Sequence, residues 1–597
     1  MSTVLETSAK SVAKGGSFLI EEHAPADIFT PEDFTEEHRM IATTAEDFVT
    51  NEVLPAEPEL EKKNWTVLVE LLRKGASLGL MSIDIPEEYG GLALDKVSSL
   101  IVSEKVAASA SFATTHGAQA GIGTLPIVYF GNEEQKKKYL PRLASVELPA
   151  AYALTESGSG SDALAAKTKA VLNAAGTHYI LNGEKMWITN GGFAELFIVF
   201  AKVDGEHFTA FIVERAFSGV STAPEEHKMG LQSSSTVAVR LDNAEVPVEN
   251  LLGEVGKGAK IAFNILNIGR FKLGASVCGG AKYALKSAVT YAKDRKQFGV
   301  PIASFGLIQE KLAEIAIRTF AAESMVYRTA GMIDDMLTTI DKSDPMAVLQ
   351  SVEEYAIECS IVKVWNSEMI DYVVDEEVQI YGGNGYSKDY PAEKHYRDSR
   401  INRIFEGTSE INRLIISSQL LKRAMKGHLP LMPAVQKLMG EVMSFPELEE
   451  DSDDVLAAEL KAVVNAKKVA LMVSGVGVQK YRDAIKDEQE LLALGSNIIM
   501  ETYAMESAVL RAKKLAQSGA GDRADVAVDM ARVFVNDSVP KIEAWAKAGL
   551  AATVDGDELR TLLAALRRFT KHTPINTVAL RRKIAARVIE TERYPLS

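Results

Sequence analysis

Apolar positions recur at helical spacing through the first part of the chain. The segments HRMIATTAEDFVTNEVLP and TVLVELLRKGASLGLM place apolar side chains three and four positions apart, and the turn-forming stretch PEEYGG interrupts this spacing. We therefore expect a helical domain over residues 37–150, preceded by an arm of residues 1–36.

The pattern changes to strand-like runs over residues 151–255. Asn182 and Gly183 separate two such runs, and this dipeptide is the strongest short-range hairpin signal. Further along, DGEH separates LFIVFAKV from FTAFIVER in the same way. The segment thus predicts an antiparallel β domain with a reversal at each of these two sites.

Helical spacing returns over residues 256–426, so the predicted strands lie between two helical blocks. This order is typical of an α+β fold and not of alternating βαβ units. Prolines and a run of acidic residues predict a linker at 427–454. Residues 455–597 are rich in Ala, Leu, Lys and Glu, and we expect them to form an appended all-α domain.

Composition narrows the classes of function. The chain has 597 residues, of which 47% are hydrophobic and 25% charged, as in ordinary globular proteins. Its net charge of -15 disfavours nucleic-acid binding, because that affinity comes from neutralising phosphates. Cys278 and Cys359 are the only cysteines, too few for a disulfide framework or a multi-cysteine metal site. The first residues lack the apolar core of a secretory signal. We expect a cytoplasmic protein without a metal.

One acidic residue needs an explanation. In RIFEGTSEINR, residues 403–413, Glu406 lies between an apolar pair and a glycine, directly before an expected helix. Thr408 or Ser409 could cap that helix, and a carboxylate near a helix N-terminus contributes up to about 1 kcal/mol of stability. On this stretch alone, the structural explanation is favoured over a catalytic one.

Other segments are ambiguous singly but specific together. They are YALTESGSGSD, MWITN, NIGRF, DRKQFG, QIYGGNGY and FEGTSEINR, in this order. With them, residues 37–425 closely resemble the acyl-CoA dehydrogenase family of flavoproteins. The region after residue 430 resembles the very-long-chain branch of that family. The resemblance implies a helical N-terminal domain, a central antiparallel β domain and a C-terminal four-helix bundle.

The resemblance further implies FAD as the cofactor and an acyl-CoA as the substrate. The positions matching the family's FAD-binding residues are Tyr152, Leu154, Thr155, Gly160, Ser161, Trp187, Ile188, Thr189, Arg295, Gln297, Phe298, Gln379, Gly382, Gly383, Thr408 and Glu410. The positions matching substrate-binding residues are Ser161, Asn267, Arg270, Phe405 and Gly407, of which Asn267 and Arg270 would meet the CoA moiety. Arg295, Gln297 and residues 379–383 would bind FAD across a subunit interface. Family members are homodimers or homotetramers, and because the region after residue 430 resembles the extension of the dimeric ones, a homodimer is expected.

In this resemblance Glu406 matches the catalytic base. Some members carry the base on the helix that here reads NILNIGRF, but the corresponding residue is Gly269 and no acid lies nearby. Ser157 replaces a proline found in many members, which should alter loop stiffness more than chemistry. A carboxylate with a pKa near 4.3 is a weak base in water, and an apolar pocket beside Phe405 and Ile404 would raise that pKa.

We therefore expect an FAD-dependent dehydrogenase that converts a long-chain acyl-CoA to the trans-2-enoyl-CoA in fatty acid β-oxidation. Electron-transferring flavoprotein would be the acceptor. Two alternatives stay open: an acyl-CoA oxidase that reduces oxygen, and a non-catalytic assembly-factor relative. The basic segment 559–595 predicts either a peripheral membrane contact by the C-terminal domain or an ordinary solvated helix face.

Overall fold

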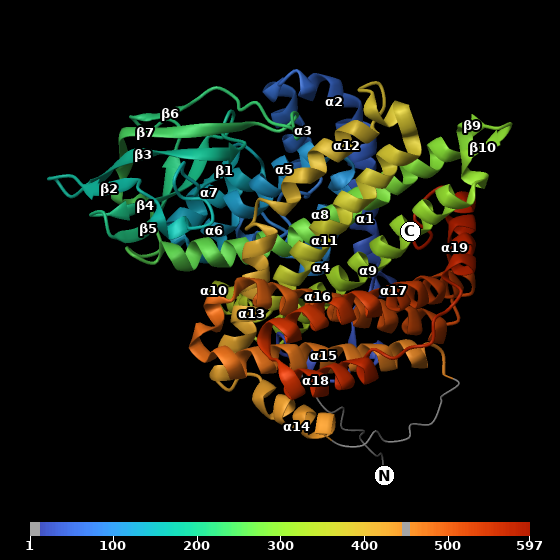
Figure 1. Ribbon diagram of the computed structural model, residues 1–597. Helices are drawn as coiled ribbons and strands as arrows, with labels where there is room; N and C mark the ends of the chain where they lie inside the picture. The colour runs from blue at the N-terminus through green and yellow to red at the C-terminus, as the bar shows by residue number, and fades with distance from the viewer. Residues whose placement is uncertain (1–11, 444–453) are drawn as a thin grey trace, which may run out of the picture.

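The computed structural model describes residues 12–443 and 454–597 (Figure 1). The expected linker falls partly on residues 444–453, which lie outside the described ranges. The N-terminal helices surround a small apolar core of their own, to which Phe48, Leu72 and Phe112 contribute. These helices are α1 (Glu36–Phe48), α2 (Leu54–Glu61), α3 (Trp65–Ser77), α4 (Lys96–Lys105), α5 (Ala110–His116), α6 (Leu125–Phe130) and α7 (Glu133–Ala144).

A sheet follows in the middle of the chain. Its strands are β1 (Ala150–Ala153), β2 (Lys169–Leu172), β3 (His178–Thr189), β4 (Leu196–Val203), β5 (His207–Glu214), β6 (Val220–Thr222), β7 (Thr236–Pro247) and β8 (Leu251–Leu252). The strand order is β6-β7-β3-β2-β4-β5-β8, with β1 also paired to β4. Most pairs are antiparallel, as expected, but β4 pairs in parallel with both β1 and β2.

The two expected strand reversals have different outcomes. The β4–β5 hairpin forms around DGEH, as expected. The prediction of a hairpin at Asn182 and Gly183 is wrong, because β3 continues through both residues with a register shift between Leu181 and Gly183. A Cβ atom at position 183 would collide with Thr168, so the glycine permits close packing of a neighbouring segment instead of a chain reversal.

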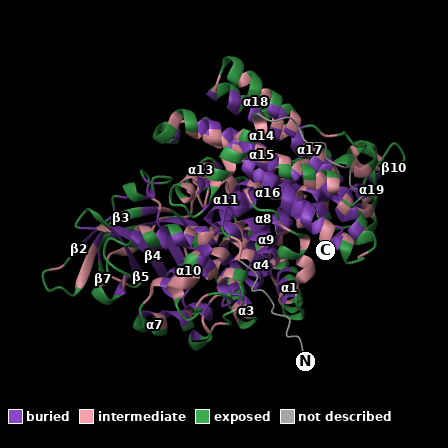
Figure 2. Cartoon of the chain, turned by 90° about the horizontal axis from the view of Figure 1, so that it is seen from below, coloured by how far each residue is buried: buried purple, intermediate pink, exposed green. Residues whose placement is uncertain are grey.

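The second helical block lies against the N-terminal helices. Its elements are α8 (Gly258–Asp294), β9 (Lys296–Gln297), β10 (Val300–Pro301), α9 (Gly306–Leu337), α10 (Pro345–Glu354), α11 (Ala356–Tyr381), α12 (Ala392–Ser399) and α13 (Ser409–Met425). Helices α8, α9 and α11 pack along one another, and α13 lies against α11. These long helices are buried on most sides (Figure 2), and α11 buries polar side chains such as Glu358 and Asn366 among its apolar ones.

The C-terminal helices are α14 (Leu431–Met443), α15 (Ala457–Tyr481), α16 (Gln489–Gln517), α17 (Asp522–Thr553), α18 (Gly556–Phe569) and α19 (Thr577–Thr591). Their buried side chains form one continuous apolar core with those of α8, α9 and α11. Several cations of the basic segment form ion pairs within the chain: Arg581 with Glu314, and Lys583 with Asp529. The membrane contact stays a prediction. Across the described ranges, no helix combines the length and the apolar character needed to cross a bilayer.

Candidate active site

Glu406 lies in a tight loop between two helical segments, η12 (Arg400–Arg403) and α13. Its φ of 57° and the φ of 84° at Gly407 are both in the left-handed region, which is costly for a residue with a side chain. Thr408 then caps α13, since its hydroxyl accepts a hydrogen bond from the Ile411 amide at 3.3 Å. The expected helix start is confirmed, but Glu406 itself points away from it and into a cavity.

Three side chains hold this loop through its backbone carbonyls. Nε of Arg270 donates to the Glu406 carbonyl at 3.2 Å, and Nζ of Lys363 donates to the Gly407 carbonyl at 2.6 Å. Asn412 donates to the Gly407 carbonyl at 2.8 Å. These bonds come from α8, α11 and α13, so three helices offset the strain of the loop.

The carboxyl group of Glu406 is poorly solvated. Oε2 is buried and has no hydrogen-bond partner among the described residues. Burial raises the pKa of Glu406 to about 7, and the nearby charges of Arg270 and Lys363 limit that rise. Phe405 lines the same cavity, as expected, whereas Ile404 is 50% exposed and contributes little to the apolar surroundings. A carboxylate in this state can accept a proton near neutral pH.

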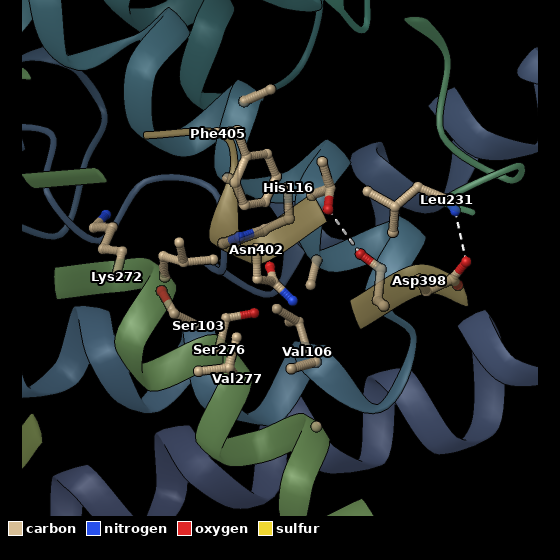
Figure 3. A pocket seen from close by; sticks show the side chains of 18 of the residues that line it. Ser103, Val106, His116, Leu231, Lys272, Ser276, Val277, Asp398, Asn402 and Phe405 are labelled. Atoms are coloured by element: carbon tan, nitrogen blue, oxygen red, sulfur yellow. Dashed lines mark hydrogen bonds between the residues drawn. The ribbon is translucent and has the colours of Figure 1, made fainter. Parts of the chain in front are cut away.

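A cavity of about 250 Å³ extends from Glu406 between the N-terminal helices and α8 (Figure 3). One face of α8 lines it at helical spacing, through Gly269, Lys272, Leu273, Ser276, Val277, Gly280 and Tyr283. Gly269 is required beside Glu406, because a Cβ atom at position 269 would lie 2.6 Å from Oε2 of Glu406. The Glu406 carboxyl fills the space that a side chain at position 269 would need, so an acid at position 269 would clash with Glu406.

Several residues that match the family's cofactor positions lie close to this cavity. Thr189 lines the cavity, and the hydroxyl of Tyr152 is buried without a hydrogen-bond partner in the described part of the chain. Burial, together with the charge of Glu406, raises the pKa of Tyr152. The Met186 amide donates to the Thr155 carbonyl at 2.8 Å, which joins the Gly/Ser loop to the end of β3 beside Trp187. Leu154 and Ile188 are buried beneath these residues, and Gly160 and Ser161 are on the exposed part of the loop.

A second group of these positions lies on the other side of the chain (Figure 1). Arg295, Gln297 and Phe298 belong to the β9–β10 hairpin, where the Phe298 side chain is 94% exposed. Gln379, Gly382 and Gly383 lie close to them, since Tyr381 stacks on Tyr291 at 4.0 Å between ring centroids. The hairpin follows the C-terminal end of α8, on the opposite side of the molecule from the sheet that carries Trp187 (Figure 1).

The remaining expected residues surround the Glu406 loop. Nη1 of Arg270 donates to Oδ1 of Asn267 at 2.7 Å, and both side chains are buried. Glu410 is exposed on the first turn of α13, where local hydrogen bonds lower its pKa. Sequence reasoning missed Lys363 and Asn412. A lysine inside the apolar run CSIVKVW was the available signal for Lys363, because a buried lysine needs an acceptor.

Comparison with known proteins decides the family. Family models for the acyl-CoA dehydrogenase N-terminal and middle domains match residues 35–147 and 151–244, and models for its C-terminal domain match 256–421 and 465–568. A probable acyl-CoA dehydrogenase of Bacillus subtilis is 53% identical over 98% of this chain and 99% of its own length. The chain belongs to the acyl-CoA dehydrogenase family.

Two further acyl-CoA dehydrogenases extend the comparison. The human mitochondrial very long-chain specific enzyme is 36% identical over 77% of this chain and 71% of its own length. The crystal structure of a Bacillus anthracis acyl-CoA dehydrogenase complexed with FAD is 55% identical, covers 98% of this chain and 100% of that one, and gives a TM-score of 0.96. This chain is an FAD-dependent acyl-CoA dehydrogenase.

The residues of this acyl-CoA dehydrogenase fit FAD. A register shift in β3 gives Trp187 a φ of 59° and leaves its side chain 56% exposed, so a flat aromatic surface faces outward. No atom lies within 4 Å of a Cβ position at Gly158 or Gly160, so backbone amides of the Gly/Ser loop are open to a ligand. An aromatic surface beside open amides suits a planar, phosphate-bearing cofactor.

Proposed function

We propose that this acyl-CoA dehydrogenase oxidises long-chain acyl-CoA to trans-2-enoyl-CoA in fatty acid β-oxidation, with Glu406 as the catalytic base. The observation that carries the proposal is the Glu406 carboxyl, buried at the end of a long cavity with Oε2 unpartnered among the described residues. A carboxylate that served only to stabilise the start of α13 would face the helix amides instead.

The chain's own residues account for removal of the α proton. Burial makes the Glu406 carboxylate a stronger base, and the Arg270 and Lys363 charges keep a fraction of it ionised. Within the described ranges the Glu406 N–H donates no hydrogen bond, so it is available to the thioester carbonyl and would acidify the α carbon. Bound FAD supplies the acceptor for the β hydride.

The length of the cavity supports a long acyl chain. The lining face of α8 continues for fourteen residues from Gly269 to Tyr283, which at 1.5 Å per residue is about 21 Å. An extended chain advances about 1.2 Å per bond, so this length accommodates roughly seventeen bonds. Acyl chains of about sixteen to eighteen carbons therefore suit the cavity.

We further propose two complementary contributions to FAD binding. Tyr152, Leu154, Thr155, Gly160, Ser161 and Trp187 to Thr189 would bind it from one subunit, with Thr408 and Glu410 nearby. Arg295 to Phe298 and Gln379 to Gly383 would bind it from a second subunit, which agrees with their distance from Trp187 and with the exposure of Phe298. This arrangement requires a homodimer. Ser161, Asn267, Arg270, Phe405 and Gly407 would contact acyl-CoA.

We propose electron-transferring flavoprotein as the electron acceptor, in the cytoplasm. An oxidase would release hydrogen peroxide from acyl-CoA in air without any added acceptor. Parallel assays of hydrogen peroxide and of the reduction of an artificial acceptor separate the two. Peroxide formed as fast as acyl-CoA is consumed would replace the dehydrogenase proposal with the oxidase one.

The base is tested with Glu406→Gln, which keeps the side-chain shape but removes the proton acceptor. General base catalysis contributes about 10² to 10⁴-fold, so flavin reduction by palmitoyl-CoA in stopped flow should slow about a thousandfold. FAD content should be unchanged. The control is Glu37→Gln, which removes an exposed carboxylate of α1. If Glu406→Gln reduces its flavin within about tenfold of the wild-type rate, Glu406 is not the base.

A further inference from the structure

The middle of the cavity carries polar side chains that the oxidation of a plain alkyl chain does not use. Asn402 lies on η12, four residues before Glu406, and Ser276 lies on α8, two turns beyond Gly269. In Figure 3 the Asn402 amide and the Ser276 hydroxyl both point into the space between their two segments. Ser103 of α4 lines the same region, and we call these three residues the polar collar.

The hydrogen-bonding capacity of the polar collar is largely unused. Within residues 12–443 and 454–597, neither the Asn402 amide nor the Ser276 hydroxyl forms a hydrogen bond. The Ser103 hydroxyl donates to the Ser99 carbonyl at 2.9 Å, which leaves its oxygen free to accept. The collar therefore offers donors and acceptors together to whatever occupies the cavity.

The surroundings make this arrangement costly for an alkyl chain. Val106, Ala107, Val277, Ile370 and Val374 give the cavity apolar walls, although ionisable side chains such as Lys272, His116 and Asp398 also line it. A saturated chain that filled this space would remove water from the amide and hydroxyl groups and give no hydrogen bond in return. A substrate with a hydroxyl at this depth would satisfy both, because a hydroxyl donates and accepts at once.

We infer that the polar collar selects acyl-CoA substrates that carry a hydroxyl group near the middle of the chain. The inference rests on the proposed function, since it assigns a substrate class to the same cavity. Asn402 and Ser276 are then specificity-determining residues, with Asn402 giving and accepting one hydrogen bond and Ser276 completing the site.

The position of the hydroxyl follows from α8. Ser276 is seven residues beyond Gly269, which contacts Glu406, and this separation is about 10 Å along the helix. At about 1.2 Å per bond, the collar lies eight or nine bonds beyond the reacting α carbon. The hydroxyl is therefore expected near carbon 10 or 11.

The test compares kcat/KM for 10-hydroxystearoyl-CoA with kcat/KM for stearoyl-CoA. The wild-type ratio should exceed one, because a polar site that the bound chain removes from water discriminates strongly against a ligand that leaves it unpaired. Asn402→Leu removes the amide at similar size and should lower this ratio about tenfold to a hundredfold. Ser276→Ala should lower it in the same direction, and it provides a second variant in case Asn402→Leu does not fold.

Two controls separate the collar from other causes. Ser418→Ala removes an exposed hydroxyl of α13 outside the cavity and should leave the ratio as in the wild type. With 16-hydroxystearoyl-CoA, whose hydroxyl lies beyond the collar, none of the variants should change the ratio to stearoyl-CoA.

The inference is overturned if the wild-type protein, Asn402→Leu and Ser276→Ala all give the same ratio for 10-hydroxystearoyl-CoA. That result would mean that water molecules, or other hydrogen bonds formed after side-chain rotation, satisfy the amide and hydroxyl groups of the polar collar. Calorimetric dissociation constants for the same two acyl-CoA esters give the ratio without turnover. Failure of the proposed function has a different signature, namely no oxidation of stearoyl-CoA in a flavin-loaded wild-type protein.

Discussion

Among the described residues that line the cavity, Glu406 is the acid whose carboxyl group has an oxygen without a hydrogen-bond partner. Burial raises its pKa to about 7. Its backbone carbonyl is bonded to Arg270, and its own pKa depends on how much water reaches Oε2. Arg270 and Lys363 therefore act on both the geometry of the loop and the acid strength of Glu406, because they bind the loop carbonyls and their charges limit the rise of the Glu406 pKa.

The pH dependence follows from the raised pKa of Glu406. Only the ionised form accepts the α proton, so kcat/KM for palmitoyl-CoA should rise with pH, reach half its maximum near pH 7 and fall about tenfold per unit well below it. Stopped-flow flavin reduction from pH 5.5 to pH 9 is the measurement. A profile that is flat between pH 5.5 and pH 7.5 would contradict the raised pKa.

At the scale of single residues, the sequence singled out Glu406 as the candidate base but did not predict its environment. Glu406 was recognisable through FEGTSEINR, and an apolar surrounding was expected from Phe405 and Ile404. In the structure, the Ile404 side chain is half exposed. The Glu406 carboxyl is instead buried against α8, where Gly269 has no side chain and leaves room for it. Contacts between residues 137 positions apart in the sequence leave no trace in local spacing.

Among the elements, α8 lines the cavity both beside Glu406 and farther along the proposed path of the acyl chain. Its lining face passes Gly269 beside Glu406 and then Gly280, whose Cβ position lies 3.8 Å from Ile370. Eleven residues separate the two glycines, or about 16 Å along the helix. A side chain at position 280 would therefore meet only the distal part of a long acyl chain.

Gly280→Leu should shorten the usable cavity. We expect kcat/KM for stearoyl-CoA to fall at least about tenfold, because the leucine overlaps the chain beyond roughly its thirteenth bond. Octanoyl-CoA ends before this point and serves as the internal control. Steady-state assays across even chain lengths give the measurement, and an equal loss for octanoyl-CoA would show that position 280 acts through the fold and not through length.

The elements themselves were more predictable than their pairing. Helical spacing located α1, α3, α8 and α9 because each buries one or more apolar faces. The Asn182–Gly183 hairpin failed, since the dipeptide signal does not distinguish a reversal from a place where another segment crosses closely. The parallel pairing of β4 with β1 depends on a segment outside the hairpin series, and no local pattern encodes it.

On the scale of the whole molecule, buried ion pairs join the two ends of the chain. Arg511 of α16 bonds Glu32 of the N-terminal arm at 2.8 Å and Glu323 of α9 at 2.6 Å. Glu323 in turn pairs with Lys282 and accepts a hydrogen bond from the Tyr594 hydroxyl at 3.0 Å. The arm, the central helices and the C-terminal helices therefore share one electrostatic network inside the common core.

Arg511→Met should destabilise the protein as a whole. The methionine keeps most of the volume but leaves Glu32 and Glu323 with less compensating charge, and breaking a buried pair of this kind costs about 3 to 5 kcal/mol. Guanidinium unfolding followed by circular dichroism gives the difference. Arg560→Met is the control, since its ion pair with Asp557 is exposed and contributes at most about 1 kcal/mol. If Arg511→Met lowers the free energy of unfolding by less than about 1 kcal/mol, the buried ion pairs of Arg511 do not stabilise the protein as predicted.

This assembly could not be read from the sequence. Composition and spacing indicated an arm, a linker and an appended helical region, and each looked independent. Buried charges such as Arg511 and Arg328 lie in helical runs where solvated positions are the ordinary expectation. Only the fold shows that their partners come from the other end of the chain.

Because the N-terminal arm packs on α16, the arm can be buried there only after α16 has been synthesised. Glu32 and Arg511 are 479 positions apart, and Phe18 packs on Tyr503 of the same helix. A ribosome that adds 5 to 20 residues per second needs roughly half a minute to a minute and a half to cover that separation. Throughout this interval the nascent chain carries Phe18 and Leu19 without the surface that later buries them. The N-terminal arm therefore reaches its buried position only after α16 has been synthesised.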